Sequence, residues 1–122
     1  QPYFYATWSR EKIPQHQKTI SSVYAQAAKE NNAGIVYVGD TWKYARKLRP
    51  KIALYIEDGS HQSSLGAFLT ACAFVKEFSK ELPEKLPNSY KVIDVNGEPI
   101  ELMHLNSLDI TFFSKVVNEI VK

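Results

Sequence analysis

The chain has 122 residues, the length of one domain that can bury a core of reasonable size. Hydrophobic residues make up 44% of it and charged residues 23%, with a formal net charge of +2. This is the composition of an ordinary globular protein, and it argues against nucleic acid as the main partner. No apolar run approaches the ~18 residues that a membrane-spanning helix needs, so we expect no membrane span.

The first half of the chain alternates short apolar runs with helical patterns. Residues 2–8 (PYFYATW) are rich in aromatic side chains and predict a buried strand, and residues 34–39 (GIVYVG) predict a second one. Asp40 is expected to cap a short helix that Pro50 stops. A helix over 14–31 is predicted between the two strands, because apolar residues recur there at the spacing of one helix face, namely Ile20, Val23, Tyr24, Ala27 and Ala28.

The second half contains a short apolar segment, two helices and a hairpin. Residues 51–56 (KIALYI) are a weak strand candidate, and a hairpin over 90–102 is predicted from the Asn96-Gly97 pair, which favours a tight turn. Helices are predicted over 63–80 and 107–121. Their expected buried faces consist of Leu65, Phe68, Leu69, Cys72 and Val75 in the first helix, and of Leu108, Phe112, Phe113, Val116, Val117 and Ile120 in the second.

This alternation predicts an α/β domain in which a parallel sheet is flanked by helices. The strands at 2–8 and 34–39 are expected to be adjacent and parallel, with the 14–31 helix as a right-handed crossover between them. Each strand–helix–strand unit takes roughly 30 residues, so a complete five-stranded sheet needs more chain than is present here. The sheet is therefore expected to be small or incomplete.

His61 follows Asp58 by three residues in the stretch YIEDGSHQSSLGAF (55–68), just before a predicted helix. Histidine is the usual general base near neutral pH, and to act on a serine hydroxyl it needs an acceptor for its Nδ1 proton. Asp58 can supply that acceptor within one turn, and Gly59 permits the unusual backbone angles of such a turn. The spacing predicts a hydrogen bond between Asp58 and His61 Nδ1, with Nε2 of His61 facing an open cleft.

The same residues also fit a loop-to-helix junction that has no catalytic role. In that interpretation Asp58, Ser60 or Ser63 caps the helix, Gly59 forms the turn and His61 points to bulk water. Asp-x-x-His is a weak pattern, so both interpretations stay open on the spacing alone.

The segment DGSHQSSLGAFLTACAFVKEF (58–78) resembles the last conserved block of the SGNH (GDSL-type) hydrolases, in which an Asp-x-x-His on a loop supplies two members of a catalytic triad. Upstream, YATW and VYAQAAKENNAGIVYVGDTW are similar to one bacterial branch of that family. The resemblance covers most of residues 2–78 and implies a flavodoxin-like fold without a cofactor. It assigns Asp58 as the triad acid and His61 as the base. Gln62 stands where proline is common in the family.

Three further blocks of that family have no counterpart in the chain. One carries the serine nucleophile in a Gly-Asp-Ser or Gly-Asn-Ser sequence, and the others bring a glycine and an asparagine for the oxyanion hole. The segment VGDTW (38–42) is similar to the nucleophile block, with Thr41 in place of serine. Thr41 lies only 17 residues before Asp58, however, which leaves no room for the two oxyanion-hole blocks. Residues 1–122 are therefore expected to be the C-terminal part of a longer SGNH hydrolase-like domain.

The other candidate residues have simpler interpretations. His16 is expected on a solvated helix face and His104 just before the last helix, and histidines scattered in this way predict no metal site. The basic run KYARKLRPK (43–51) is interpreted as a solvated helix face. Cys72 is the only cysteine, which excludes an internal disulfide, and its apolar neighbours predict a small core residue.

The resemblance implies a serine ester hydrolase for small-molecule or carbohydrate esters, to which this chain is expected to contribute Asp58 and His61 while being inactive alone. The alternative is a non-catalytic α/β binding or interaction domain. Besides the substrate, the expected partner is an N-terminal segment of the same protein or a second copy, because a missing strand leaves an unpaired edge and exposed apolar side chains. The compartment stays open, with secretion and the periplasm among the alternatives.

Overall fold

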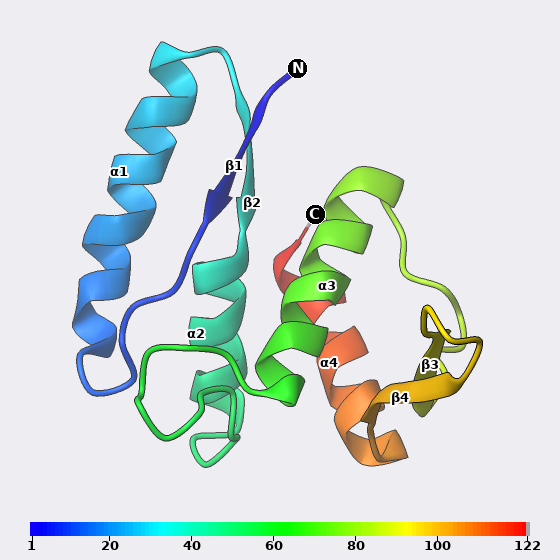
Figure 1. Cartoon of the computed structure of the whole chain (residues 1–122). Coiled ribbons are helices and arrows are strands. Elements are labelled where there is room, and N and C mark those ends of the chain that lie inside the picture. The colour runs from blue at the N-terminus through cyan, green and yellow to red at the C-terminus, as the bar shows by residue number, and fades with distance from the viewer. Residues whose placement is uncertain (122) are drawn as a thin grey trace.

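The computed structural model describes residues 1–121. In chain order the elements are β1 (Tyr3–Ala6), the 3-10 helix η1 (Pro14–His16), α1 (Gln17–Glu30), β2 (Gly34–Tyr37), α2 (Val38–Leu48), α3 (Ser64–Ser79), β3 (Ser89–Ile93), β4 (Pro99–His104) and α4 (Ser107–Ile120). In Figure 1, α1 lies on one side of the β1–β2 pair, α3 and α4 lie on the other, and α2 continues directly from β2. None of the helices within residues 1–121 is both long and apolar enough to cross a membrane.

The parallel pair predicted from the sequence is present. β1 and β2 run in the same direction with Tyr3 opposite Gly34 and Ala6 opposite Tyr37, and α1 lies between them in the chain. The sheet that they form has two strands. The strand predicted at 51–56 is wrong: that segment makes only an isolated bridge, between Tyr55 and Gln62. The coarse α/β prediction is therefore confirmed, with a very small sheet.

The two strands are less buried than the sequence predicted. Tyr3 and Tyr5 of β1 are each 39% exposed, and Tyr37 of β2 is 41% exposed. Strand side chains project from the two faces of the sheet, and on this small sheet the neighbouring elements cover these rings only in part. Tyr3 packs edge-on against the exposed ring of Phe78 in α3, with 4.7 Å between the ring centroids. An apolar surface thus lies along β1 and α3.

The predicted capping role of Asp40 is wrong, because α2 begins at Val38, immediately after β2. Asp40 lies inside the first turn of α2, and its Oδ2 accepts a hydrogen bond from Ser21 Oγ of α1 at 2.8 Å. Val38 and Trp42 of this helix both belong to the buried core. The α2 helix ends at Leu48, two residues before Pro50, as predicted.

The core is built around Trp42 of α2, which is 1% exposed. Its indole stacks on Trp8 with 3.9 Å between the ring centroids and 2° between the ring planes, and its Nε1 donates to Thr70 Oγ1 in α3. Cys72 is buried as predicted, and burial raises the pKa of its thiol to about 12. Three side chains that the helical spacing placed on buried faces are instead exposed, namely Val23, Val75 and Leu108.

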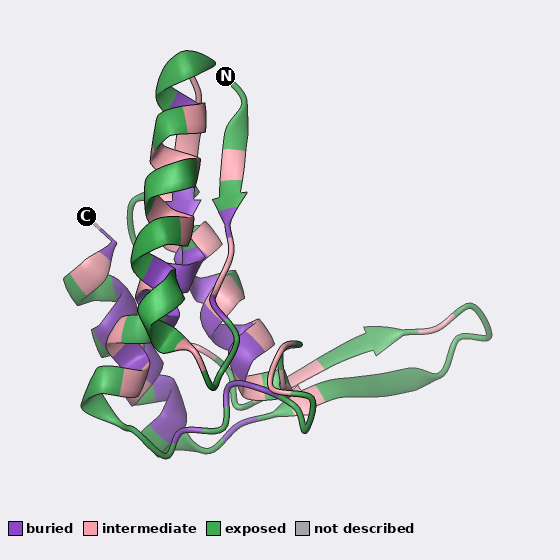
Figure 2. Ribbon diagram, turned by 90° about the vertical axis from the view of Figure 1, so that its left-hand side faces the viewer, coloured by how far each residue is buried: buried purple, intermediate pink, exposed green. Residues whose placement is uncertain are grey.

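The predicted hairpin is present and is longer than expected. β3 and β4 pair in antiparallel fashion from Ser89–His104 at the base to Ile93–Pro99 near the tip. Gly97 adopts a φ of +80° in the connecting turn, which explains the glycine there. Figure 2 shows the hairpin extending away from the helices with most of its surface exposed, whereas the buried residues gather where the helices face one another.

Candidate active site

Residues 54–63 fold into a tight loop that leads into α3. The Ile56 amide donates to the His61 carbonyl at 2.9 Å and the Ser63 amide donates to the Leu54 carbonyl at 2.8 Å, so the two ends of the loop are held side by side. Gly59 has a φ of +65°, the left-handed conformation expected of the glycine in this turn. The helix cap is Ser63, whose Oγ accepts a hydrogen bond from the Gly66 amide at 3.1 Å.

The segment that follows β1 anchors this loop. Trp8 Nε1 donates to the Ser60 carbonyl at 2.8 Å, and the Glu11 amide donates to the Gly59 carbonyl at 2.8 Å. The loop therefore lies beyond the carboxyl end of β1. In open α/β sheets this end of the strands is where ligands bind and where reactive side chains gather.

Asp58 and His61 contact each other directly within the loop. Asp58 Oδ2 lies 2.5 Å from His61 Nδ1, and Oδ1 accepts hydrogen bonds from the backbone amides of Ser60 and His61, both at 2.9 Å. The hydrogen bond to the His61 side chain, followed by those to the two amides, lowers the pKa of Asp58 from 3.8 to about 2. Asp58 is thus a fixed carboxylate that can orient an imidazole.

His61 is turned to solvent. Its side chain is 73% exposed and that of Asp58 is 43% exposed, and within residues 1–121 no hydrogen bond reaches His61 Nε2. The predicted cleft around Nε2 is therefore not formed by the described residues, because no element of that part of the chain covers the outer side of the loop. The catalytic interpretation predicted the contact between Asp58 and the His61 ring, and the non-catalytic interpretation predicted hydrogen bonds from backbone amides to Asp58. The Asp58 carboxylate makes both kinds of contact.

The structure also bears on a nucleophile within the chain. Thr41 is fully buried, and its Oγ1 donates to the carbonyl of Tyr37, the last residue of β2, at 2.8 Å, which argues against Thr41 as the nucleophile. Ser63 Oγ is used twice, as the α3 cap and as a donor to the Ala53 carbonyl at 2.6 Å. Neither hydroxyl forms a hydrogen bond with His61 Nε2.

The sequence did not reveal that Trp8 and Glu11 hold the loop. The partners of these bonds are about 50 residues apart along the chain, and no local pattern encodes such contacts. Of the other histidines, His16 lies exposed at the start of α1 and His104 lies exposed at the end of β4. No group of three or more metal-ligating side chains occurs within residues 1–121.

A comparison of the sequence with known protein families found no match, and neither the curated proteins nor the solved structures contain a significant match to this chain.

Proposed function

We propose that this chain supplies the base and the orienting acid of a serine ester hydrolase of the SGNH (GDSL) type. The observation that carries the proposal is the 2.5 Å contact between Asp58 Oδ2 and His61 Nδ1, in a loop tied to the carboxyl end of β1. A carboxylate on Nδ1 favours the tautomer in which Nε2 is unprotonated, and Nε2 is the atom that lacks a partner within residues 1–121. The resemblance of residues 58–78 to the family block agrees with this assignment.

In the proposed mechanism, a serine hydroxyl outside this chain attacks the carbonyl carbon of an acyl ester. His61 Nε2 takes the hydroxyl proton as the carbon–oxygen bond forms, and it returns that proton to the alcohol that leaves. A water molecule then attacks the acyl-enzyme with His61 again as the base. Asp58, with its pKa held near 2, stays ionised and stabilises the imidazolium that forms in each step.

The segment that brings the serine is proposed to lie beside the β1–β2 pair. Both edges of this sheet lack a further strand among the described residues, and Tyr3 and Tyr5 remain 39% exposed on β1. An unpaired edge with apolar neighbours is a template for another strand. The partner in this proposal is an N-terminal segment of the same protein or a second copy, and the substrate is a small-molecule or carbohydrate ester.

A fluorophosphonate probe tests the proposal, because it reacts covalently with a serine that a histidine base activates. The natural protein containing this chain is treated with the probe, and the labelled residue is located by mass spectrometry. We expect one labelled serine and near-complete loss of its labelling in His61→Ala. His104→Ala, which removes an exposed histidine outside the loop, is the matched control and is expected to label normally.

Equal labelling of wild type and His61→Ala contradicts the proposal. So does the absence of any labelled serine in the natural protein, and that result favours the alternative of a non-catalytic binding or interaction domain.

A further inference from the structure

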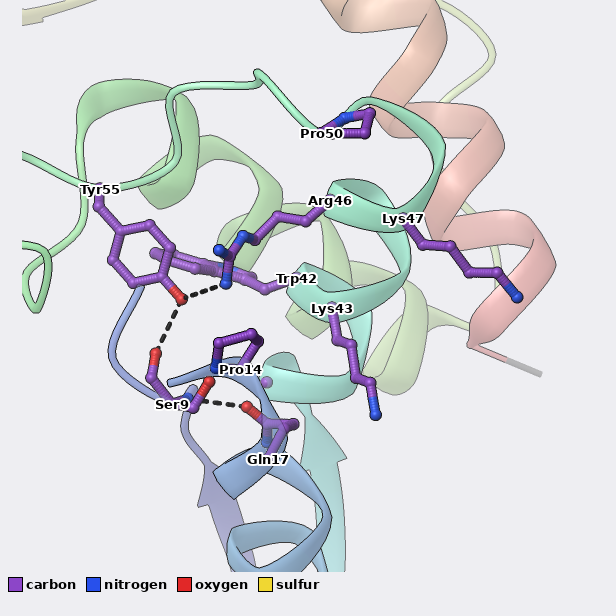
Figure 3. A pocket seen from close by; sticks show the side chains of 10 residues that line it. Ser9, Pro14, Gln17, Trp42, Lys43, Arg46, Lys47, Pro50 and Tyr55 are labelled. Atoms are coloured by element: carbon purple, nitrogen blue, oxygen red, sulfur yellow. Dashed lines mark hydrogen bonds between the residues drawn. The ribbon is translucent and has the colours of Figure 1, made fainter. Parts of the chain in front are cut away.

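A cavity of about 280 Å³ opens between the start of α1, the outer face of α2 and Tyr55. Figure 3 shows its lining side chains at close range. Pro14, Trp42 and Tyr55 contribute apolar surface to its walls. Binding sites for drug-sized ligands span about 300–1,000 Å³, so this cavity suits a smaller molecule. Neither Asp58 nor His61 lines it.

The charged residues that line the cavity all have the same sign. Lys43, Arg46 and Lys47 line it, and no aspartate or glutamate does. None of the three forms an ion pair with a carboxylate within residues 1–121. The nearest carboxylate along α2, that of Asp40, is bonded to Ser21 Oγ. The cavity is therefore lined by three cations without an ion-pair partner among residues 1–121, and the Glu11 carboxylate, which lies close enough to Tyr55 to act on its hydroxyl, is the acidic group that faces them from the neighbouring segment.

This arrangement has a cost in the unliganded chain. Lys43 is three residues before Arg46 and four before Lys47, and like charges at these spacings on a helix repel each other. Arg46 and Lys47 lie in the last turn of α2, where the helix dipole favours cations. Lys43 lies a turn earlier and lacks that compensation. An anion in the cavity would relieve the repulsion.

The three cations differ in how they are held. Arg46 Nη1 donates to the Tyr55 hydroxyl at 3.3 Å and Nη2 donates to the Glu11 carbonyl at 2.9 Å, so the guanidinium is fixed before any ligand arrives. Tyr55 is itself held by its hydroxyl, which donates to the Ser9 carbonyl at 2.8 Å. In Figure 3 the amino groups of Lys43 and Lys47 extend past the rim instead. Their long stems allow both groups to fold over a bound anion.

We propose that this cavity binds a small soluble phosphate monoester. The phosphate lies at the mouth between Lys43 and Lys47, and the rest of the molecule lies against Tyr55 and Pro14. Two of the Arg46 nitrogens are already bonded, so the lysines are left to bind the anion as point charges. A dianionic ester also matches a site with three cations better than a monoanion does. The proposal does not depend on the Asp58–His61 pair.

Isothermal titration of the 122-residue chain with phenyl phosphate tests this site, with inorganic phosphate and benzyl alcohol as the two partial ligands. We expect phenyl phosphate to bind with 1:1 stoichiometry and more tightly than either partial ligand. The double variant Lys43→Ala/Lys47→Ala is expected to weaken it by about tenfold or more, since charge-assisted bonds to phosphate are lost. Lys29→Ala/Lys115→Ala removes the same charge at exposed positions of α1 and α4 and serves as the control.

Three outcomes overturn the proposal. The first is that phenyl phosphate fails to saturate the chain at millimolar concentration. The second is that benzyl alcohol binds as tightly as phenyl phosphate, and the third is that the control variant loses as much affinity for phenyl phosphate as Lys43→Ala/Lys47→Ala. All the substituted lysines are exposed, so thermal unfolding is expected to verify that both double variants remain folded.

Discussion

Asp58 and His61 are joined by two kinds of hydrogen bond at once: Asp58 Oδ2 lies 2.5 Å from the imidazole Nδ1, and Asp58 Oδ1 accepts the backbone amide of the same histidine at 2.9 Å. The hydrogen bond from the backbone amide fixes the position of the His61 backbone, and the hydrogen bond with Nδ1 fixes the orientation of the ring. The carboxylate is fixed in turn by the Ser60 amide, and Trp8 holds the Ser60 carbonyl. Orientation of the ring is thus a property of the whole loop.

The first prediction concerns the tautomer of His61. In the neutral ring, the proton is expected on Nδ1, where Asp58 accepts it, and long-range proton–nitrogen NMR of the imidazole reports this directly. In Asp58→Asn the side-chain amide can donate to Nδ1, so the proton is expected to move to Nε2. Asp94→Asn is the matched control, because Asp94 Oδ1 also accepts two backbone amides in a turn but contacts no histidine. An unchanged tautomer in Asp58→Asn would show that Asp58 does not orient the ring.

The second prediction concerns acid stability. The pKa of Asp58 is lower in the folded chain, about 2, than its ordinary value of 3.8, so the ionised carboxylate favours the folded state. This contribution is fully present above about pH 4 and is lost as the pH falls towards 2. We expect the melting temperature of Asp58→Asn to vary less than that of the wild type between pH 5 and about pH 2, by thermal circular dichroism. Identical pH profiles for the two proteins would refute the assignment.

The third prediction concerns the packing of α3 against α2. A Cβ at Gly66 would lie 2.3 Å from the Leu54 carbonyl oxygen and 2.8 Å from the Trp42 ring. Both neighbours are buried, so Gly66→Ala forces a backbone shift and is expected to destabilise the fold by about 1–3 kcal/mol, measured by urea unfolding. Ser64→Ala, at an exposed position two residues earlier, is the control and is expected to stay within about 0.5 kcal/mol of the wild type.

The fourth prediction concerns the isolated chain. Neither Thr41 nor Ser63 has its hydroxyl on His61 Nε2, so the 122 residues alone are expected to hydrolyse short-chain aryl esters no faster than their own His61→Ala variant. A clear difference in rate between the two would reveal a nucleophile within the chain.

The local features of the fold were predictable because local rules determine them. Helical spacing gave α3 and α4 to within a residue or two, Asn96-Gly97 marked the hairpin turn, and the Asp-x-x-His spacing gave the side-chain contact between Asp58 and His61. Each of these depends on residues close in sequence, whose geometry is fixed by the helix or the turn.

The features that could not be predicted depend on distant residues. Val75 and Leu108 fit a helix face by spacing, yet they are 40% and 81% exposed, because burial depends on which elements lie nearby. The sequence also suggested a cleft at His61, where the described residues leave the ring 73% exposed. Burial and cleft formation depend on the tertiary arrangement, which local patterns of spacing and residue type do not reveal.

The central proposal is that His61 is the base of an ester hydrolase, and the pH dependence of any ester hydrolysis by the full-length protein tests it most directly. If His61 is the general base, His61→Ala lowers kcat/KM by about 10²–10⁴-fold or more and removes the pH dependence that a general base gives to kcat/KM. His104→Ala is expected to keep both the rate and the profile. Hydrolysis by His61→Ala at the wild-type rate, with an unchanged pH profile, would contradict the account.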